Sequence, residues 1–320
     1  MNISAKIIAS GSYLPNKILT NDDLSKLVDT SNDWIVERTG IKQRHISDSD
    51  QTTSDLGHLA CVDLFKNSTI SKDQIEMIIV ATTTPDLTFP STACLIQQKL
   101  GIKSAFAFDV QAVCSGFVYA LTIANNFIKT GMVKNAIVIG CETLSKIVDW
   151  KDRNTCVLFG DGAGAVLLQA STELDSGIIG CSLNSDGSLN DILKTSGGVS
   201  LNQKSGFIEM QGKEVYKHAV EKMYNSVVST LEKCHLKTTD IDLLIPHQAN
   251  LRILNSVASR LNLSEDKVII TLDKHANTSA ASIPLAFDFA IKNNKIKKND
   301  LIVFEALGGG LTWGSVIFRF

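Results

Sequence analysis

The sequence predicts an α/β protein made of two similar halves that are related by a pseudo-two-fold axis. Short β-branched runs alternate with stretches of helical period, such as 75–80 and 117–129, which is typical of strand-helix-strand units around buried sheets. The same order of segments occurs twice, because 75–80 matches 241–246 at an offset of 166 residues. We therefore expect one half at residues 1–172 and the other at 173–320.

Two further matches support this internal repeat. Residues 137–138 match 302–303 at an offset of 165, and each half ends in a glycine-rich turn that enters an apolar strand, at 159–166 and 307–314. Glycine there permits close approach of the backbone to a ligand. The first turn contains Gly162-Ala163-Gly164, but it lacks the spacing and the following helix of a dinucleotide-binding motif, so we do not favour that interpretation.

The composition is that of a soluble globular protein. The chain has 320 residues, of which 44% are apolar and 20% charged, and its net charge of −2 gives no indication of nucleic-acid binding. Its N-terminus lacks the apolar core of a signal peptide, and no apolar run approaches the length of a membrane-spanning helix. We expect a cytoplasmic protein without a membrane partner.

The cysteines form no recognisable framework. There are seven, an odd number, and no two have the C-x-x-C spacing. This pattern argues against a disulfide scaffold and against a structural zinc site, so we predict no bound metal. Six of the seven are most simply small core residues.

Cys114 differs from the other six because of its position in the chain. It follows an extended apolar run and precedes the helical stretch that begins near Phe117. A thiol at a helix N-terminus lies near unpaired N–H groups, which favour the thiolate, so Cys114 is a candidate nucleophile. A buried cysteine that only packs in the core is the alternative.

Two further polar residues lie at equivalent junctions in the second half. His247 follows the apolar run 241–245, and Asn277 precedes a second helical stretch, in a segment where 273–279 matches 109–115 at an offset of 164. Chemistry in α/β folds is usually found where strands give way to loops or helices. Either residue alone could be a structural histidine or a helix cap. Because a pseudo-two-fold brings equivalent strand ends together, we expect both to meet Cys114 in one cavity.

These three side chains suit thioester chemistry that needs no metal or redox cofactor. A Cys nucleophile forms an acyl-enzyme, and its oxyanion can be bound by the backbone N–H groups of Cys114 and Gly309. His247 and Asn277 could donate to one carbonyl oxygen of a malonyl thioester and stabilise the enolate left by decarboxylation. Asn277 could instead orient His247 as a base for hydrolysis, which leaves a thioester hydrolase or acyltransferase open.

The motifs closely resemble those of the β-ketoacyl-acyl-carrier-protein synthase III family. The resemblance runs from Asp33-Trp34-Ile35-Val36-Glu37-Arg38 through the Cys114 segment to Pro246-His247-Gln248-Ala249-Asn250, 275–282 and 308–314. It implies a thiolase-like fold with five layers, α-β-α-β-α, and a homodimer. The implied reaction is decarboxylating condensation of a short acyl-CoA, commonly acetyl-CoA, with malonyl-acyl carrier protein to initiate fatty-acid synthesis. A non-catalytic acyl-CoA-binding sensor would be free to lose the catalytic side chains, and all three are present.

The same resemblance implies several binding roles. Trp34, Arg38 and Arg153 match positions that hold the coenzyme A adenine and phosphate, although Arg153 alone would read as a solvated loop charge. Phe89 matches the residue that crosses the dimer interface to floor the acyl pocket; an ordinary core phenylalanine is the alternative. The pantetheine tunnel is implied for Gly212 and Asn250, and carrier-protein docking for Lys213, Lys217 and Arg252.

Two positions depart from the family pattern. Leu307 stands where members often carry Phe before the glycines. In the helical stretch after Asn250, Ser259-Arg260 has a single cation, Arg260, where some members have two.

Overall fold

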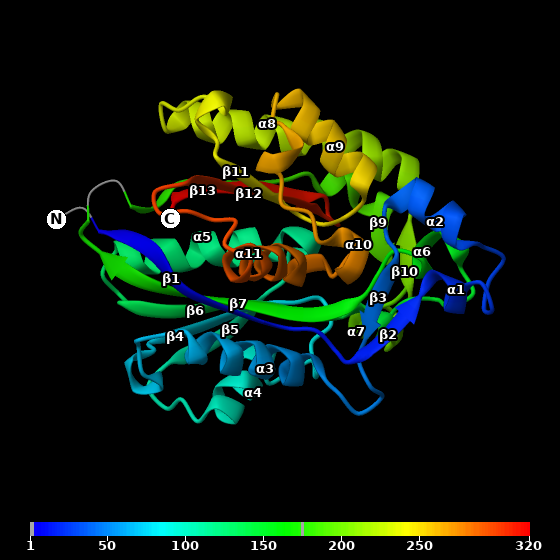
Figure 1. Ribbon diagram of the computed structural model, residues 1–320. Coiled ribbons are helices and arrows are strands. Elements are labelled where there is room, and N and C mark those ends of the chain that lie inside the picture. Colours follow the sequence, from blue (N-terminus) through cyan, green and yellow to red (C-terminus); the bar gives the residue numbers. More distant parts are fainter. Residues whose placement is uncertain (1–2, 174–175) are drawn as a thin grey trace.

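The computed structural model describes residues 3–173 and 176–320, and its main elements form five layers (Figure 1). Two helices cover a five-stranded sheet, two more fill the space between this sheet and a four-stranded one, and the last two cover the second sheet. The predicted α-β-α-β-α architecture is therefore confirmed. From one outer layer to the other, the helices are α3 (Thr53–Lys66) and α4 (Thr92–Leu100), α5 (Gly116–Lys129) and α11 (Ser282–Lys292), and α8 (Gly212–Lys233) and α9 (Leu251–Arg260).

The first sheet has the strand order β1-β7-β6-β4-β5. Strand β4 is parallel to both of its neighbours, whereas β7 is antiparallel to β1 and β6. Strands β4 and β6 are buried along their whole lengths, as expected for a sheet covered on both faces, and β5 lies at an edge. The strands are β1 (Ser4–Tyr13), β4 (Met77–Ala81), β5 (Phe106–Val110), β6 (Asn135–Thr143) and β7 (Asp161–Ser171).

The second sheet repeats this pattern in the order β11-β12-β13-β8, with only β11 and β12 parallel. Where a counterpart of β5 would lie, Leu244 makes a single parallel bridge to Val268. The strand pairing also corrects one predicted match: Ile137 pairs with Ile78 and Val303 pairs with Leu244, so 137 corresponds to 303, one position later than predicted. The strands are β8 (Gly177–Ser185), β11 (Leu243–Pro246), β12 (Leu301–Gly308) and β13 (Thr312–Arg319). The boundary between the halves at 172 and 173 stays a prediction.

The central helices α5 and α11 are apolar on most of their surface because each is covered by sheets on two sides. Phe117 and Leu121 of α5 and Phe287 of α11 join the inner faces of both sheets in one buried cluster. Separate clusters lie between the first sheet and α3 and α4, and between the second sheet and α8 and α9. Three buried clusters, the first of which fills both inner interfaces, therefore hold the five layers in place.

A short turn precedes each central helix and repeats the same backbone conformation. These are η2 (Val113–Ser115) before α5 and η7 (Ser279–Ala281) before α11. Their first residues, Val113 and Ser279, lie 166 positions apart and have φ of 48° and 50°. Turn η2 packs on β12 and η7 on β6, where any Cβ at Gly140 would collide with the carbonyl oxygen of Ala280. Cys114 therefore corresponds to Ala280.

This correspondence shows that the match of 109–115 with 273–279 was wrong by two residues. The loop from Val268 to Ser279 is longer than the one from Ala107 to Val113, because α10 (Leu272–His275) is inserted in it. The shared aspartate that suggested the alignment does not occupy equivalent positions.

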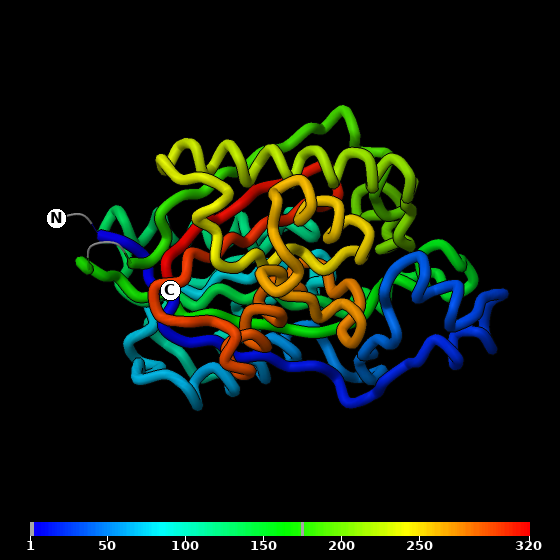
Figure 2. The backbone as a smooth tube through the Cα atoms, turned by 45° about the horizontal axis from the view of Figure 1, so that its top comes forward, coloured from blue at the N-terminus to red at the C-terminus, as the bar shows by residue number. Residues whose placement is uncertain are grey.

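Smaller elements cap the end of the molecule where both turns lie. The hairpin β2–β3 and helix α2 project there, and α2 packs on α9, as a second view also shows (Figure 2). The small elements are β2 (Lys17–Thr20), β3 (Gln43–Ile46), β9 (Leu193–Thr195), β10 (Ile208–Met210), α1 (Asn21–Leu24), α2 (Asn32–Thr39), α6 (Arg153–Cys156) and α7 (Val199–Asn202). The remaining 3-10 turns are η1 (Lys72–Gln74), η3 (Leu144–Lys146), η4 (Gly187–Ile192), η5 (Thr238–Asp240) and η6 (Glu265–Lys267).

Candidate active site

Cys114, His247 and Asn277 line the same cavity, although they are far apart in the chain. The cavity has a volume of about 560 Å³ and is lined near the surface by residues of α2, α8 and α9. The three side chains are its buried end, with 5%, 2% and 7% of their surfaces exposed. The structure therefore brings the three sequence-predicted residues together.

A second cavity, of about 620 Å³, meets the first at Cys114. Cys114, Phe159 and Leu193 line both cavities. The second cavity is lined deep inside by Thr83, Leu144 and Ile147, and it reaches the surface at the exposed residues Lys194 and Val199. A thioester at Cys114 would thus have space on two sides.

Turn η2 holds Cys114 at the entrance to α5, as the sequence indicates, but the direction of its pKa differs from the expectation. Burial raises the pKa of the Cys114 thiol to about 12, and the neighbouring Ser279 hydroxyl opposes this only in part. The nearby Glu142 carboxylate raises the pKa further. The thiol is therefore neutral near pH 7, since removal from water outweighs the partial charge of the helix terminus.

His247 lies directly after β11 and is held by its backbone and its ring. Its N–H donates to the carbonyl of Glu305 on β12 over 2.8 Å, and its ring Nδ1 lies 2.7 Å from Ser282 Oγ. That hydroxyl oxygen also accepts the N–H of Gln248 at 3.3 Å. If the hydroxyl proton is directed at Nδ1, the ring carries its own proton on Nε2. Burial lowers the pKa of His247 to about 3, so the ring is neutral and Nε2–H is a donor.

Asn277 is oriented by a different set of bonds. Its backbone pairs with the segment before β7, donating to Leu158 and accepting from Gly160, each over 3.0 Å. Its side-chain oxygen accepts the N–H of Ser279 at 2.9 Å. This contact identifies which end of the amide is the oxygen. The NH2 group at the other end is then the donor that is available to the cavity.

Ser279 and Ser282 thus contact the two candidate donors, and the sequence argument did not identify either of them. Both lie in the segment 275–282, which was singled out for Asn277 alone. Ser279 fixes the amide and Ser282 contacts the imidazole, so one turn orients both donors. A hydroxyl at the first residue of a helix that follows a candidate site segment is a signal that could have identified Ser282.

The region proposed as an oxyanion hole is built by close packing of β12 on η2. A Cβ on Gly308 would lie 2.7 Å from the Cys114 nitrogen, so only glycine fits there. Thr312 Oγ1 donates to the carbonyls of Ala112 and Gly309, at 3.0 and 3.1 Å, and so ties both segments together. Gly309 lines the second cavity beside Cys114, and its role as an oxyanion donor remains a prediction.

The aromatic and basic residues predicted to hold coenzyme A gather at the cavity mouth. The guanidinium carbons of Arg38 and Arg153 lie 4.5 and 4.9 Å from the Trp34 ring centroid. Arg153 also donates to the carbonyl of Asp29 at 2.7 Å, so it is a stacked and hydrogen-bonded side chain. Such an arrangement suits a planar, phosphate-bearing group.

Asn250 and Gly212 are the residues predicted to line a pantetheine tunnel, and that role stays a prediction. Both line the first cavity. Asn250 caps α9 by accepting the N–H of Arg252 at 2.9 Å, and its NH2 donates to the Arg38 carbonyl at 3.0 Å. Its amide is therefore already engaged in joining α9 to α2. Gly212 is the first residue of α8.

The predicted docking cations lie on the helices around the mouth. Lys213 and Arg252 line the cavity entrance, and Lys217 is exposed about one turn further along α8. Arg252 donates to the carbonyl of Glu37 at 2.9 Å. These positions form an exposed basic rim, whose partner remains a prediction.

Phe89 and Leu307 differ in how far they are buried. Phe89 is 83% exposed and lies in the loop between β4 and α4, so it is not a core residue. It lines neither cavity of its own chain. Leu307, by contrast, is buried and lines the first cavity with His247.

Within residues 3–173 and 176–320, no cluster of three or more His, Cys, Asp or Glu has the arrangement of a metal site. In the same part of the chain, no helix is both long enough and apolar enough to cross a membrane.

Comparisons with known proteins identify the family. Models of 3-oxoacyl-[acyl-carrier-protein (ACP)] synthase III match residues 108–187 and, for its C-terminal part, 231–320. Proteins named beta-ketoacyl-[acyl-carrier-protein] synthase III are 55% identical in Ehrlichia canis, over 98% of both chains, and 51% identical in Paramagnetospirillum magneticum, over 100% of both. The crystal structure of 3-oxoacyl-[acyl-carrier-protein] synthase III from Aquifex aeolicus matches with a TM-score of 0.94 at 47% identity, covering 99% of this chain and 100% of that one. The chain therefore belongs to the β-ketoacyl-acyl-carrier-protein synthase III family, whose thiolase-like fold and condensing acyltransferase activity its motifs predict.

Proposed function

We propose that the protein condenses a short acyl-CoA, such as acetyl-CoA, with malonyl-acyl carrier protein through an acyl-Cys114 intermediate. This is the reaction that initiates fatty-acid synthesis, in accordance with the family. One observation supports the division of roles: His247 and Asn277 are oriented separately, by Ser282 and Ser279. Each is thereby left with a donor for the cavity that ends at Cys114.

In the first step the Cys114 sulfur attacks the acyl-CoA carbonyl. The C–S bond to coenzyme A breaks, the acyl group is transferred to Cys114, and the thiol proton leaves with the coenzyme A sulfur. The N–H groups of Cys114 and Gly309 would bind the oxyanion of this step. The acyl chain would occupy the second cavity, since the first one, with Trp34 and Arg38 at its mouth, would admit the thiol arm of coenzyme A.

In the second step the malonyl thioester loses its carboxylate as CO₂. The electron pair forms an enolate, whose oxygen receives hydrogen bonds from His247 Nε2 and the Asn277 amide. The enolate carbon then attacks acyl-Cys114, which forms the carbon–carbon bond and releases the thiolate to take up a proton. Neutral His247 suits this donor role, because its lowered pKa makes it a poor base.

A thioester hydrolase on the same scaffold is the second candidate, and the hydrogen bonds disfavour it. In a Cys-His-Asn hydrolase the Asn orients the imidazole. Here the imidazole Nδ1 lies against Ser282, and the Asn277 oxygen accepts from Ser279. Neither contact joins Asn277 to His247.

We further propose a cytoplasmic homodimer that needs no cofactor beyond its thioester substrates. Strand β5 is a sheet edge with free backbone groups, and Phe106 on it is partly exposed. Leu87 and Phe89 are exposed apolar residues that a second subunit would cover. In such a dimer, Phe89 would floor the acyl pocket of the partner subunit.

The decisive experiment is to incubate the purified protein with acetyl-CoA and malonyl-acyl carrier protein and to weigh the carrier protein by mass spectrometry. We expect acetoacetyl-carrier protein, with one CO₂ and one coenzyme A released for each product. Release of acetate and coenzyme A, with unchanged malonyl-carrier protein, would instead establish the hydrolase.

Substrate binding is tested separately. Arg38→Ala and Arg153→Ala should raise the KM for acyl-CoA and leave the carrier-protein KM nearly unchanged, because both contact the Trp34 ring. Arg252→Glu should do the reverse, with a smaller relative defect at high salt. Unchanged carrier-protein kinetics for Arg252→Glu would remove the docking role.

A further inference from the structure

The exposed loop that carries Phe89 is fastened to its own subunit at both ends. We call residues 87–90 the prong. Leu87 and Phe89 are 53% and 83% exposed, so the prong makes few contacts of its own. Its position therefore depends on the residues that flank it.

On the far side of the prong, the chain is fixed by the start of α4. Ser91 caps this helix by accepting the N–H of Cys94 at 3.2 Å. The carboxylate of Asp109 accepts the N–H groups of Thr92 and Ala93 at 2.7 and 2.8 Å. The end of the prong is thus held by β5 and α4.

On the near side, the deepest anchor is a buried carboxylate on β6. Glu142 accepts the Thr84 hydroxyl at 2.7 Å and the Thr83 N–H at 3.1 Å. Thr53 Oγ1 donates to the Thr84 carbonyl at 2.5 Å. This anchor ends at residue 84, three positions before the prong begins.

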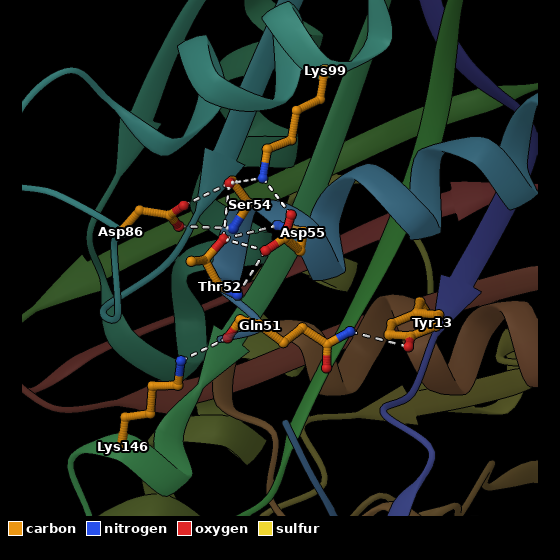
Figure 3. A network of polar contacts seen from close by, with 8 residues as sticks. All are labelled: Tyr13, Gln51, Thr52, Ser54, Asp55, Asp86, Lys99 and Lys146. Carbon is orange, nitrogen blue, oxygen red and sulfur yellow. Dashed lines mark hydrogen bonds and ion pairs between the residues drawn. The ribbon is translucent and has the colours of Figure 1, made fainter. Parts of the chain in front are cut away.

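Asp86 is the last anchor before the prong. Its two carboxylate oxygens accept the N–H of Ser54 at 2.8 Å and the Ser54 hydroxyl at 2.6 Å, at the N-terminus of α3 (Figure 3). A carboxylate is favoured there by the unpaired N–H groups and by the helix dipole. Asp86 therefore joins the root of the prong to a helix of the outer layer.

A wider network holds the Ser54 side of this contact. Lys99 of α4 donates to Ser54 Oγ at 2.7 Å and to Asp55 at 2.5 Å, and Asp55 also caps α3 with Thr52 (Figure 3). The hydrogen bonds of the Asp55 carboxylate go to Lys99 and Thr52, and none that the described part of the chain shows goes to residues 84–90. Of Asp55 and Asp86, only Asp86 therefore links α3 directly to the prong.

We propose that Asp86 is a positioning residue that sets the length of the starter chain, because it fixes how deeply Phe89 enters the partner subunit's acyl pocket. The inference rests on the proposed function, in which Phe89 floors that pocket. Loss of the Asp86 contact would let the prong move at its root, while Cys114, His247 and Asn277 stay in place on other elements.

The test compares kcat/KM for hexanoyl-CoA with that for acetyl-CoA in Asp86→Ala. We expect the hexanoyl-to-acetyl ratio to rise about tenfold, since relief of overpacking by a few methylene groups has about this effect. The acetyl value itself should change by less than about threefold. Asp86→Asn keeps an acceptor for the Ser54 N–H and should stay near the wild-type ratio.

Three further variants make the result decisive. Asp63→Ala breaks the contacts of the other end of α3 with Ser12 and Lys292 and leaves the network around Ser54 intact, so it should lower the melting temperature and leave the ratio unchanged. If Asp86→Ala does not fold, Ser54→Ala removes one of the two bonds and should shift the ratio in the same direction by a smaller factor. Phe89→Ala should raise the ratio.

The outcomes separate the two claims. A shifted ratio in Phe89→Ala with no shift in Asp86→Ala, or in Ser54→Ala if that variant replaces it, overturns the role of Asp86 and leaves the pocket floor intact. An unshifted ratio in Phe89→Ala overturns the floor and, with it, this inference. Equal losses for both acyl-CoA substrates in Asp86→Ala would show a merely structural role.

Discussion

The two turns η2 and η7 have the same backbone form and carry different chemistry. Val113 and Ser279 share a positive φ, and Cys114 in one turn corresponds to Ala280 in the other. The first turn carries Cys114, the proposed nucleophile. The second has no thiol at that position, and Ser279 instead orients the Asn277 amide through its N–H. In the proposed mechanism, the duplicated scaffold thus divides covalent chemistry from electrostatic stabilisation.

A second contrast concerns buried acids on the corresponding strands β6 and β12. Glu142 is buried with hydrogen bonds from three consecutive threonines, Thr82 to Thr84. Glu305 is equally buried, but neither of its carboxylate oxygens has a hydrogen-bond partner among residues 3–173 and 176–320. The first half thus has a hydrogen-bonded carboxyl group, Glu142, beside the site. The second half has a carboxyl group without such hydrogen bonds, Glu305, under α8.

The largest effect should come from removing the nucleophile of the first turn. Cys114→Ala should abolish labelling by radiolabelled acetyl-CoA, because no other thiol lies at the junction of the two cavities. Cys61→Ala is the matched control, since Cys61 is also buried and burial also raises its pKa to about 12. Label that persists on another cysteine in Cys114→Ala would refute the assignment of the nucleophile to Cys114 in η2.

The next effect comes from the donors of the second half. His247→Ala or Asn277→Ala should lower decarboxylation and condensation about 10²–10³-fold, as is typical for loss of one oxyanion donor. Self-acylation from acetyl-CoA should fall far less. The two steps are measured separately, by CO₂ release from malonyl-carrier protein and by acyl-enzyme mass. Equal losses in both would favour a general base at His247.

The periodicity and the strand ends, which are local properties, predicted two α/β halves and the three residues that meet in one cavity, and the family resemblance implied the five layers. The sequence did not predict the correspondence of Cys114 with Ala280, since an inserted helix, α10, shifts the alignment without a sequence marker. It also missed Ser282, whose contact with His247 joins α11 to β11 across 35 residues. The pKa of Cys114 was expected to fall; burial by elements from both halves raises it, and burial is a property of the whole fold.

The contrast between Glu142 and Glu305 can be tested by measuring the free energy of unfolding of variants at different pH values. Burial raises the pKa of Glu305 from 4.5 to about 8, so the folded protein holds a proton that the unfolded chain loses above pH 4.5. The contribution of Glu305 to stability is therefore greatest below pH 4.5 and falls as the pH rises toward 8, by about 3 kcal/mol at pH 7. Glu305→Gln should recover most of this at pH 7 and flatten the pH dependence of denaturant unfolding.

Glu142→Gln is the matched control for that measurement. Its new NH2 group would face the donors of Thr83 and Thr84, so this variant should lose stability. A gain of stability for Glu142→Gln, or a loss for Glu305→Gln, would contradict the contrast between the two acids.

The smallest effect tests how the second half orients its donors. Ser282→Ala removes the hydroxyl that lies 2.7 Å from His247 Nδ1, so the proton of the neutral ring is free to move from Nε2 to Nδ1. We expect condensation to slow about tenfold, in line with the loss of one neutral hydrogen bond, with self-acylation unchanged. Ser282→Thr should restore the rate, and Ser226→Ala, a buried hydroxyl on α8 that lines neither cavity, should leave it unaltered. The defect should be the same from about pH 5 to 8, because burial lowers the pKa of His247 to about 3 and the ring does not titrate in this range. A defect that appears only below pH 7 would show instead that Ser282 acts on a protonated imidazole.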